Sequence, residues 1–364
     1  MAKKIDNIFL DTSLFIKENF LEGKRIKSIF SLATKGYFKL YFSIITIEEV
    51  KNQYKKRITG AIEKHNQLIN DKTNDIRVLR NNKSGKDILQ KFPKVNDLCL
   101  EFNELLSDAI DEAGATVLEY PVLNIKSVFE DYFHGRSPFG GADKKAEFPD
   151  AFALAHIASW SADHKSKAII LTQDKDFTKH TYGSVVVDHE YEKYVQDKLK
   201  LLLEDRISIL EKIYYEKSEQ IDKEILDWVE DQLWIDSTYD NAVNYMDIHE
   251  ISIEELEIVS KSYEIIGVES DKIDDQYIYI EVMAHIRYKV VLNIDDEETG
   301  IWDSEDKVML WRETKDLTLS DDDLKIPVKI FFEIVDTEEY DDDPQIDEIN
   351  NSKDLNIDGP DYFY

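Results

Sequence analysis

The stretch IFLDTSLF, residues 8–15, decides the fold of the first half of the chain. Three apolar residues typical of a buried strand run directly into Asp11, and Leu14 and Phe15 then begin a segment with helical spacing. The stretch AIILTQDKDF, residues 168–177, repeats this order around Asp174. Strands that alternate with helices predict an α/β fold with a parallel sheet.

Further elements extend this pattern outward from residues 8–15. Strand-like runs lie at 39–45 and 183–189, and helical patterns cover 24–35 and 94–113. A long helix-rich stretch begins at Thr46, and the run AFALAHIASW after Asp150 is apolar nearly all round, which predicts a buried helix. We therefore expect a parallel sheet flanked by helices.

The second half of the chain has a different character. Residues 191–249 show helical apolar spacing, whereas residues 250–336 alternate polar and apolar side chains as antiparallel strands with one wet face do. Residues 337–364 are acidic and polar, which is typical of a loose tail. The predicted domains are 1–190, a helical connector at 191–249, a small β-rich domain at 250–336, and the acidic tail.

The net charge of −31 is unevenly distributed. Residues 1–200 carry 31 Lys and Arg against 29 Asp and Glu, whereas residues 201–364 carry 14 against 47. Within residues 1–100 the counts are 20 basic and 11 acidic. Because steering depends on the local field, the sequence permits a nucleic-acid substrate on the basic part only.

Several functional classes are excluded by missing motifs. The single cysteine, Cys99, rules out an intrachain disulfide framework and a cysteine-based zinc site. No Walker loop, GxGxxG motif or paired Cys/His spacing is present. We see no signal peptide and no apolar stretch long enough to span a bilayer, so we expect a cytoplasmic protein without a membrane partner.

Four acids stand at equivalent places in this pattern: Asp11, Glu49 in ITIEEVKN, Asp150 in EFPDAFALAHIA, and Asp174. The carboxyl ends of parallel strands meet at one edge of a sheet, so these carboxylates can converge there. Converging carboxylates bind hard divalent cations such as Mg²⁺ or Mn²⁺. Such ions are the usual means of hydrolysing a phosphodiester, so the four acids predict a metal-dependent nuclease.

Each acid also has a purely structural interpretation. Asp11 and Asp174 are suitable N-caps, and Asp150 favours the dipole of a first helical turn. Thr46 and Glu49 have the spacing of a capping box. These interpretations stay open at the level of the sequence.

Taken together, the four motifs resemble the PIN-domain nuclease family over residues 1–190. The matching segments are IFLDTS, Glu49–Val50, DAFALAHIA and IILTQDKDF. The EFPDAF context is similar to a branch of the family that carries a C-terminal extension. The resemblance implies a nuclease whose metal is held by Asp11, Glu49, Asp150 and Asp174, with Glu49 rather than Glu48 as the second acid and Asp176 as an additional ligand or a helix-start acid.

Neighbouring residues are candidates for supporting roles. Thr12, Ser13 and Thr172 can orient a ligand or a phosphate oxygen, or make ordinary strand-end hydrogen bonds. Lys144 and Lys145 can contact phosphates, or remain solvated in a loop. Asp143 and Glu147 can approach the metal, with solvated loop charge as the alternative. The Lys/Arg-rich stretch 51–94 is the candidate track for a strand, and candidates for base stacking or core packing are Tyr54, Tyr132, Phe133 and Phe139.

The sequence thus predicts a metal-dependent endoribonuclease that cleaves single-stranded RNA, since PIN-like domains imply RNA more often than DNA. The alternatives are a non-catalytic scaffold that keeps the fold and a structure-specific DNA nuclease. The acidic second half is a candidate surface for a protein partner, and a homo-oligomer is left open.

Overall fold

The computed structural model divides the chain into two compact units, Met1–Leu199 and Lys200–Tyr364, which are described here one by one. These are called the N-terminal and the C-terminal unit. The residues described are 5–70, 76–120, 125–139, 145, 147–174, 183–203, 206–239, 248–269, 276–296, 299–303, 308–334, 344–353 and 355.

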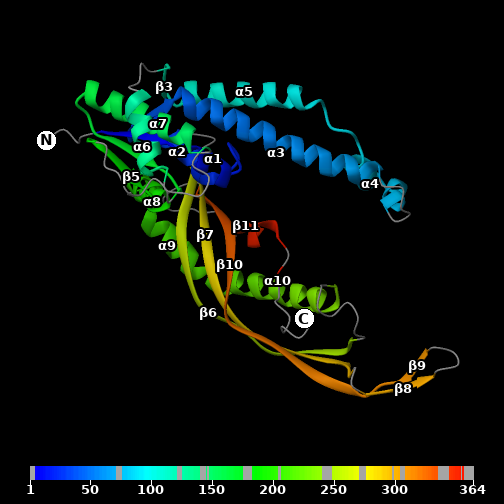
Figure 1. The fold of residues 1–364 in the computed structure, drawn as a ribbon. Coiled ribbons are helices and arrows are strands. Elements are labelled where there is room, and N and C mark those ends of the chain that lie inside the picture. Colours follow the sequence, from blue (N-terminus) through cyan, green and yellow to red (C-terminus); the bar gives the residue numbers. More distant parts are fainter. Residues whose placement is uncertain are drawn as a thin grey trace. The chain divides into compact units, whose positions relative to one another are not determined.

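The N-terminal unit is built on a five-stranded sheet of order β3-β2-β1-β4-β5, in which all neighbouring strands run parallel (Figure 1). The predicted parallel α/β sheet is therefore confirmed. The strand order reverses between β1 and β4, where a doubly wound sheet opens a crevice at its carboxyl edge. The strands are β1 Asp6–Leu10, β2 Phe38–Ser43, β3 Thr116–Leu118, β4 Ala168–Leu171 and β5 Val185–Asp188.

Helix α7, Phe148–Asp163, packs its apolar face on this sheet. Leu154, Ile157 and Trp160 join Phe9 of β1 and Ile170 of β4 in one buried cluster. Ala151 of the same helix belongs to a second buried cluster with Val128 and Phe139, and the two clusters together explain why the helix is apolar nearly all round. The other helices near the sheet are α1 Thr12–Lys17, α2 Lys24–Thr34, α6 Ile125–His134 and α8 Tyr191–Leu202.

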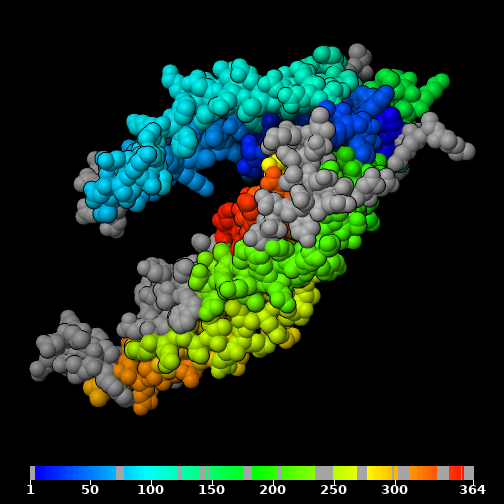
Figure 2. Space-filling view, turned by 180° about the vertical axis from the view of Figure 1, so that it is seen from behind, coloured from blue at the N-terminus to red at the C-terminus, as the bar shows by residue number. Residues whose placement is uncertain are grey.

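Two long helices form an arm of the N-terminal unit. Helix α3, Ile44–Asn70, and helix α5, Val95–Glu112, lie along each other in the blue-to-cyan part of Figure 2. Stacked rings of Tyr54 and Phe102, with centroids 3.9 Å apart, join the two helices. The 3₁₀ helix η1 Ile76–Asn81 and helix α4 Lys83–Ile88 lie between them in the chain.

The C-terminal unit is a helical segment followed by an antiparallel sheet of order β11-β10-β7-β6 (Figure 1). The predicted change from helices to antiparallel strands is therefore confirmed. Along β7 every second residue is buried, from Ile278 to Ile294, which explains the alternating sequence. The elements are α9 Ile207–Glu216, α10 Ser218–Tyr239, β6 Ile248–Glu269, β7 Gln276–Asp295, β8 Ile301–Asp303, β9 Val308–Trp311, β10 Thr314–Ile334, β11 Gln345–Ile349 and η3 Asn350–Ser352.

Strand β11 lies in the segment that was expected to form a loose tail. It pairs antiparallel with β10, and the Lys329 ammonium lies 2.5 Å from the Glu348 carboxylate across the pair. Ile346 and Ile349 are the only apolar residues of this strand, so the acidic composition of the segment outweighed them in the sequence-based prediction. Strand β11 therefore adds to the sheet a strand that the sequence did not predict.

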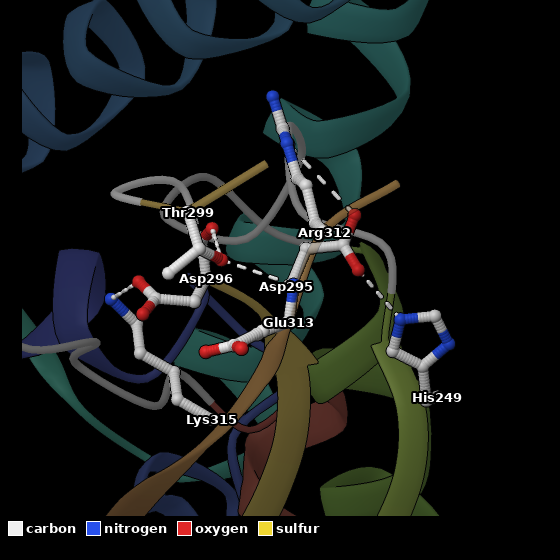
Figure 3. A network of polar contacts seen from close by, with 7 residues as sticks. All are labelled: His249, Asp295, Asp296, Thr299, Arg312, Glu313 and Lys315. Atoms are coloured by element: carbon white, nitrogen blue, oxygen red, sulfur yellow. Dashed lines mark hydrogen bonds and ion pairs between the residues drawn. The ribbon is translucent and has the colours of Figure 1, made fainter. Parts of the chain in front are cut away.

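A polar network ties three strands together at one end of this sheet (Figure 3). The Nε2 atom of His249 on β6 lies 2.7 Å from Oδ1 of Asp295 at the end of β7, and Arg312 Nη1 lies 3.8 Å from Oδ2 of the same carboxylate. Lys315 on β10 donates to Asp296 at 2.9 Å. Because exposed ion pairs contribute little stability singly, the alternating buried side chains, and not this network, are the main determinant of strand register.

None of the helices in the described ranges combines the length and the apolar character that crossing a membrane requires.

Candidate functional site

The carboxyl edge of the parallel sheet brings the sequence-predicted acids to one region of the N-terminal unit. Asp11 follows β1, and Asp174 comes shortly after β4, its neighbour in the sheet. Glu49 lies in the second turn of α3, which begins directly after β2, and Asp150 lies in the first turn of α7. The crevice between β1 and β4 is therefore flanked by acids from four separate segments.

Hydrogen bonds hold Asp11 firmly at this edge. It is the N-cap of α1 and accepts from the backbone N–H of Ser13 at 3.3 Å. The hydroxyl groups of Ser13 and Thr172 donate to the same oxygen, Oδ2, at 2.5 and 2.7 Å. The N-cap interpretation is thus confirmed, and Asp11 is at the same time part of the acidic site.

Thr172 links the ends of the two central strands. Besides donating to Asp11, its Oγ1 accepts from the backbone N–H of Asp174 at 2.9 Å. Ser13 Oγ accepts from the N–H of Gln173 at 3.1 Å. The hydroxyl groups of Ser13 and Thr172 therefore position the acids that follow β1 and β4.

Glu49 is held by the hydroxyl group of Thr12, in the segment IFLDTS. Thr12 Oγ1 donates to Glu49 Oε2 at 3.0 Å. Burial raises the pKa of Glu49, and the charge of Asp11 raises it further, while the Thr12 hydrogen bond opposes both effects. The neighbouring Glu48 is exposed and pairs with Lys51 at 2.8 Å, so Glu49 is the residue that faces the other acids.

The capping-box interpretation of Thr46 and Glu49 is wrong, because α3 begins at Ile44, two residues earlier. Thr46 is buried inside the first turn. The hydroxyl of Ser43 instead accepts from the backbone N–H of Ile45 at 3.2 Å and takes the capping position.

Asp150 shows how strongly the carboxylates repel one another. It stands in the first turn of α7 next to Pro149. Its pKa is raised to about 8, first by burial and then by the charges of Asp11, Glu49, Asp174 and Glu147. A nearby cation would favour the charged form of this carboxyl group and so lower its pKa.

The other predicted site residues fall into two groups. Lys145 is exposed, and Glu147 acts on Asp150 through its charge. Asp143, Lys144 and Asp176 lie outside the described residues, so their predicted roles stay predictions.

Comparison with known protein families agrees with this arrangement. Residues 8–177 match the family model of the PIN domain. These residues form a PIN domain. The predicted family is therefore confirmed, whereas membership of the branch with the EFPDAF motif stays a prediction. No curated protein and no solved structure was found to match the chain.

The PIN domain has a nuclease fold, and the chemistry of its donor set fits a hard divalent cation. The carboxylates supply oxygen ligands, and their mutual repulsion in a partly buried site is relieved by positive charge. Within the described ranges no three His, Cys, Asp or Glu side chains stand close enough together to hold one ion. Direct ligation therefore requires rotation of side chains or bridging water.

A groove between α3 and α5 is the feature of the PIN domain that sequence reasoning missed. Its volume is about 510 Å³, and it lies on the arm, close to the start of α3. The spacing of Asn96, Leu100 and Asn103 along α5 could have indicated a shared face, but it matches an ordinary solvated helix equally well. The groove is lined by Glu48, Lys51, Asn52, Lys55, Asn96, Cys99, Leu100 and Asn103.

Proposed function

We propose that the PIN domain is a metal-dependent endoribonuclease that cleaves single-stranded RNA. The observation that carries this proposal is the placement of four acids at neighbouring strand and helix ends, near enough that their charges add to the effect of burial in raising the pKa of Asp150. A site that kept the fold only as a scaffold has no reason to gather uncompensated carboxylates, because their repulsion costs stability. The non-catalytic alternative therefore leaves this cost unexplained.

In this proposal Asp11, Glu49, Asp150 and Asp174 hold one or two Mg²⁺ or Mn²⁺ ions, directly or through water. When bound, such an ion activates a water molecule and offsets charge on the leaving oxygen. The hydroxyl groups of Thr12, Ser13 and Thr172 keep the carboxylates in position. Asp176 is proposed as a further ligand.

The substrate is assigned from the shape and charge of the arm. Residues 51–94 carry 12 Lys and Arg against 4 Asp and Glu, so they form a basic path that starts two residues after Glu49. A flexible single strand can follow such a path and bend into the acidic crevice. Lys145 is proposed to contact a phosphate near the cleaved bond, and Lys144 is proposed for the same role.

The C-terminal unit is not assigned to RNA binding. Residues 201–364 carry 14 basic and 47 acidic side chains, which repel a polyanion. We propose that this unit binds a protein partner with a basic surface, and self-association of the chain is a second proposal.

The deciding experiment is cleavage of end-labelled single-stranded RNA and DNA with Mg²⁺, Mn²⁺ or EDTA. Asp11→Asn and Asp150→Asn are expected to abolish metal-dependent cleavage of RNA. Asp163→Asn is the matched control, because Asp163 is an exposed acid at the other end of α7. It is expected to cleave as the wild type does.

Other outcomes would favour the alternatives. Cleavage of DNA alone would favour the structure-specific DNA nuclease. No cleavage of either strand by the folded protein with a divalent ion present would favour the scaffold.

A further inference from the structure

We propose that the α3/α5 groove is a nucleotide-binding subsite, which holds one nucleotide of a single-stranded nucleic acid beside the acidic crevice. Lys51 and Lys55 contact the phosphate, and the carboxamides of Asn52, Asn96 and Asn103 contact the edge of the base. This inference rests on the proposed nuclease function for one point, that the bound strand is RNA. Binding itself is measured without cleavage.

The walls of the groove have matching periodicity. Lys51 and Lys55 are four residues apart on α3, so their side chains leave the same side of the helix. On α5, Asn96, Cys99 and Asn103 recur at helical spacing and face α3 across the groove. The polar groups of both helices therefore converge on one space of about 510 Å³.

Ring packing fixes the distance between the walls. Phe102 is buried and stacks on Tyr54 at 3.9 Å, and Phe20 contacts both rings edge-on at 5.5 and 5.1 Å. Burial raises the pKa of Tyr54, and the nearby Cys99 and Glu101 add to this shift. A groove whose walls are joined by three packed rings is preformed, as a binding site should be.

The lining has the chemistry of a nucleotide site rather than of an apolar peptide groove. Leu100 is the sole large apolar residue among the eight lining residues. Each carboxamide offers both a donor and an acceptor, which complements the edge of a base, and the ammonium groups complement a phosphate. The Lys51–Glu48 ion pair, at 2.8 Å, holds the ammonium near the groove.

The position of the groove connects it to the candidate active site. Lys55 follows Glu49 by six residues, which corresponds to about 9 Å along the axis of α3. The groove begins at Glu48, the residue before Glu49, so it lies on the face of the first turns of α3 next to the face that carries Glu49.

The single cysteine of the chain provides a direct measurement, because Cys99 lines the groove and is half-buried. The rate at which N-ethylmaleimide modifies Cys99 is measured in EDTA, with and without a short single-stranded RNA. We expect the RNA to slow modification several-fold. Unchanged modification at an RNA concentration that saturates binding would overturn the proposal.

Substitutions distinguish direct protection from an indirect effect. Lys51→Ala with Lys55→Ala should restore Cys99 modification in the presence of RNA. The slope of log affinity against log salt should fall by about 0.7, since the loss of one phosphate contact of a single strand contributes that amount. Asn96→Ala with Asn103→Ala should change the preference among homopolymers and leave the salt slope unchanged.

The matched control is Lys35→Ala with Lys167→Ala, which removes the same charge. Both residues are exposed and precede the amino ends of β2 and β4, opposite the carboxyl edge. An equal loss of salt slope in this control would overturn the assignment of the phosphate to the groove. If RNA protects Cys99 but is not cleaved when Mg²⁺ or Mn²⁺ is added, the subsite is supported and the nuclease proposal is contradicted. If RNA is cleaved but does not protect Cys99, the nuclease proposal is supported and the subsite is contradicted.

Discussion

The hydroxyl of Ser43 and the Nδ1 atom of His156 lie 2.9 Å apart in the buried interior of the N-terminal unit. Ser43 Oγ also accepts from the N–H of Ile45, and because a hydroxyl has two acceptor sites and one donor, the tautomer of the neutral His156 ring sets the direction of its bond to Ser43. Burial lowers the pKa of His156 and favours this neutral form. Ser43 begins the helix that carries Glu49, and His156 lies on the helix that carries Asp150, so this bond connects the supports of two acids.

We therefore predict that Ser43→Ala loosens the candidate site. It leaves Nδ1 of His156 buried without its hydrogen-bond partner, which costs about 1–3 kcal/mol of unfolding free energy. Urea unfolding measures this loss, and RNA cleavage should show a lower kcat with little change in KM. Ser28→Ala is the control, because this buried serine donates to the carbonyl of Lys24 within its own helix and should cost less. Equal losses in both variants would contradict the prediction.

The raised pKa of Asp150 predicts an unusual dependence of stability on pH. A folded-state pKa of about 8 lies above the ordinary value of 3.8, so the folded protein keeps a proton that the unfolded chain releases. This contribution is fully present below about pH 4 and is lost as the pH rises toward 8. Asp150→Asn removes this pH dependence, because the amide does not titrate. The melting temperature of the variant should therefore rise relative to that of the wild type as the pH increases.

Thermal unfolding in EDTA at pH 5.5 and pH 8.5 tests this prediction through the difference between the two proteins. We expect the advantage of Asp150→Asn to be several degrees larger at the higher pH. Mg²⁺ should raise the melting temperature of the wild type at pH 8.5 more than that of the variant. A pH-independent difference would show that the charge of Asp150 is compensated.

The sheet and the acids could be predicted from the sequence because both follow from local patterns. Ile8, Phe9 and Leu10 are apolar because β1 is central in the sheet. Asp11 comes next because its carboxylate caps the first turn of the helix that follows the strand. Parallel strand ends then meet at one edge for geometric reasons. The positions of these acids at the strand ends therefore follow from neighbouring residues alone.

The rest depended on contacts between distant residues. The bond between Ser43 and His156 spans 113 positions of sequence, and neither residue stands in a recognisable motif. The groove needs two helices separated by a long connection, and its lining residues resemble a solvated surface when α3 or α5 is read alone. The start of α3 does not follow from residue types, because Ser43 and Thr46 are both acceptable caps, and the structure begins the helix at Ile44.

Two glycines should respond oppositely to alanine. A Cβ atom at Gly23 would lie 2.2 Å from Oε2 of Glu18 and 2.7 Å from its carbonyl oxygen. Glu18 is buried and accepts from the hydroxyl of Tyr191 at 3.0 Å, so it cannot move freely. We expect Gly23→Ala to cost about 1–3 kcal/mol.

Gly60 is the matched control in the middle of α3, where an added Cβ meets nothing within 4 Å. Gly60→Ala should stabilise the protein by about 0.5–1 kcal/mol, because alanine loses less conformational freedom in a helix. Chemical unfolding of both variants gives the two values. A loss at Gly60 similar to that at Gly23 would mean that the arm needs its glycine for a bend.

Phe133 and Phe139 were both candidates for base stacking, and the structure separates them. Phe133 is 74% exposed on α6, whereas Phe139 is 0% exposed and packs against Tyr132 and Phe148. Phe129, four residues before Phe133, contacts Phe148, two residues from Asp150. Of these two rings, only the exposed ring of Phe133 is free of core packing, so we keep it as the candidate for stacking on a base.

We predict that Phe133→Ala weakens binding of single-stranded RNA in EDTA by about 1–3 kcal/mol and leaves the unfolding free energy unchanged. Phe133→Tyr keeps a ring and should bind as the wild type does. Phe139→Ala should instead lower stability by about 3–5 kcal/mol, because it empties a packed aromatic cluster. Fluorescence anisotropy with labelled RNA and urea unfolding measure the two quantities independently. Wild-type affinity in Phe133→Ala would show that the strand does not pass over α6, and the exposed ring would then be free for a different contact.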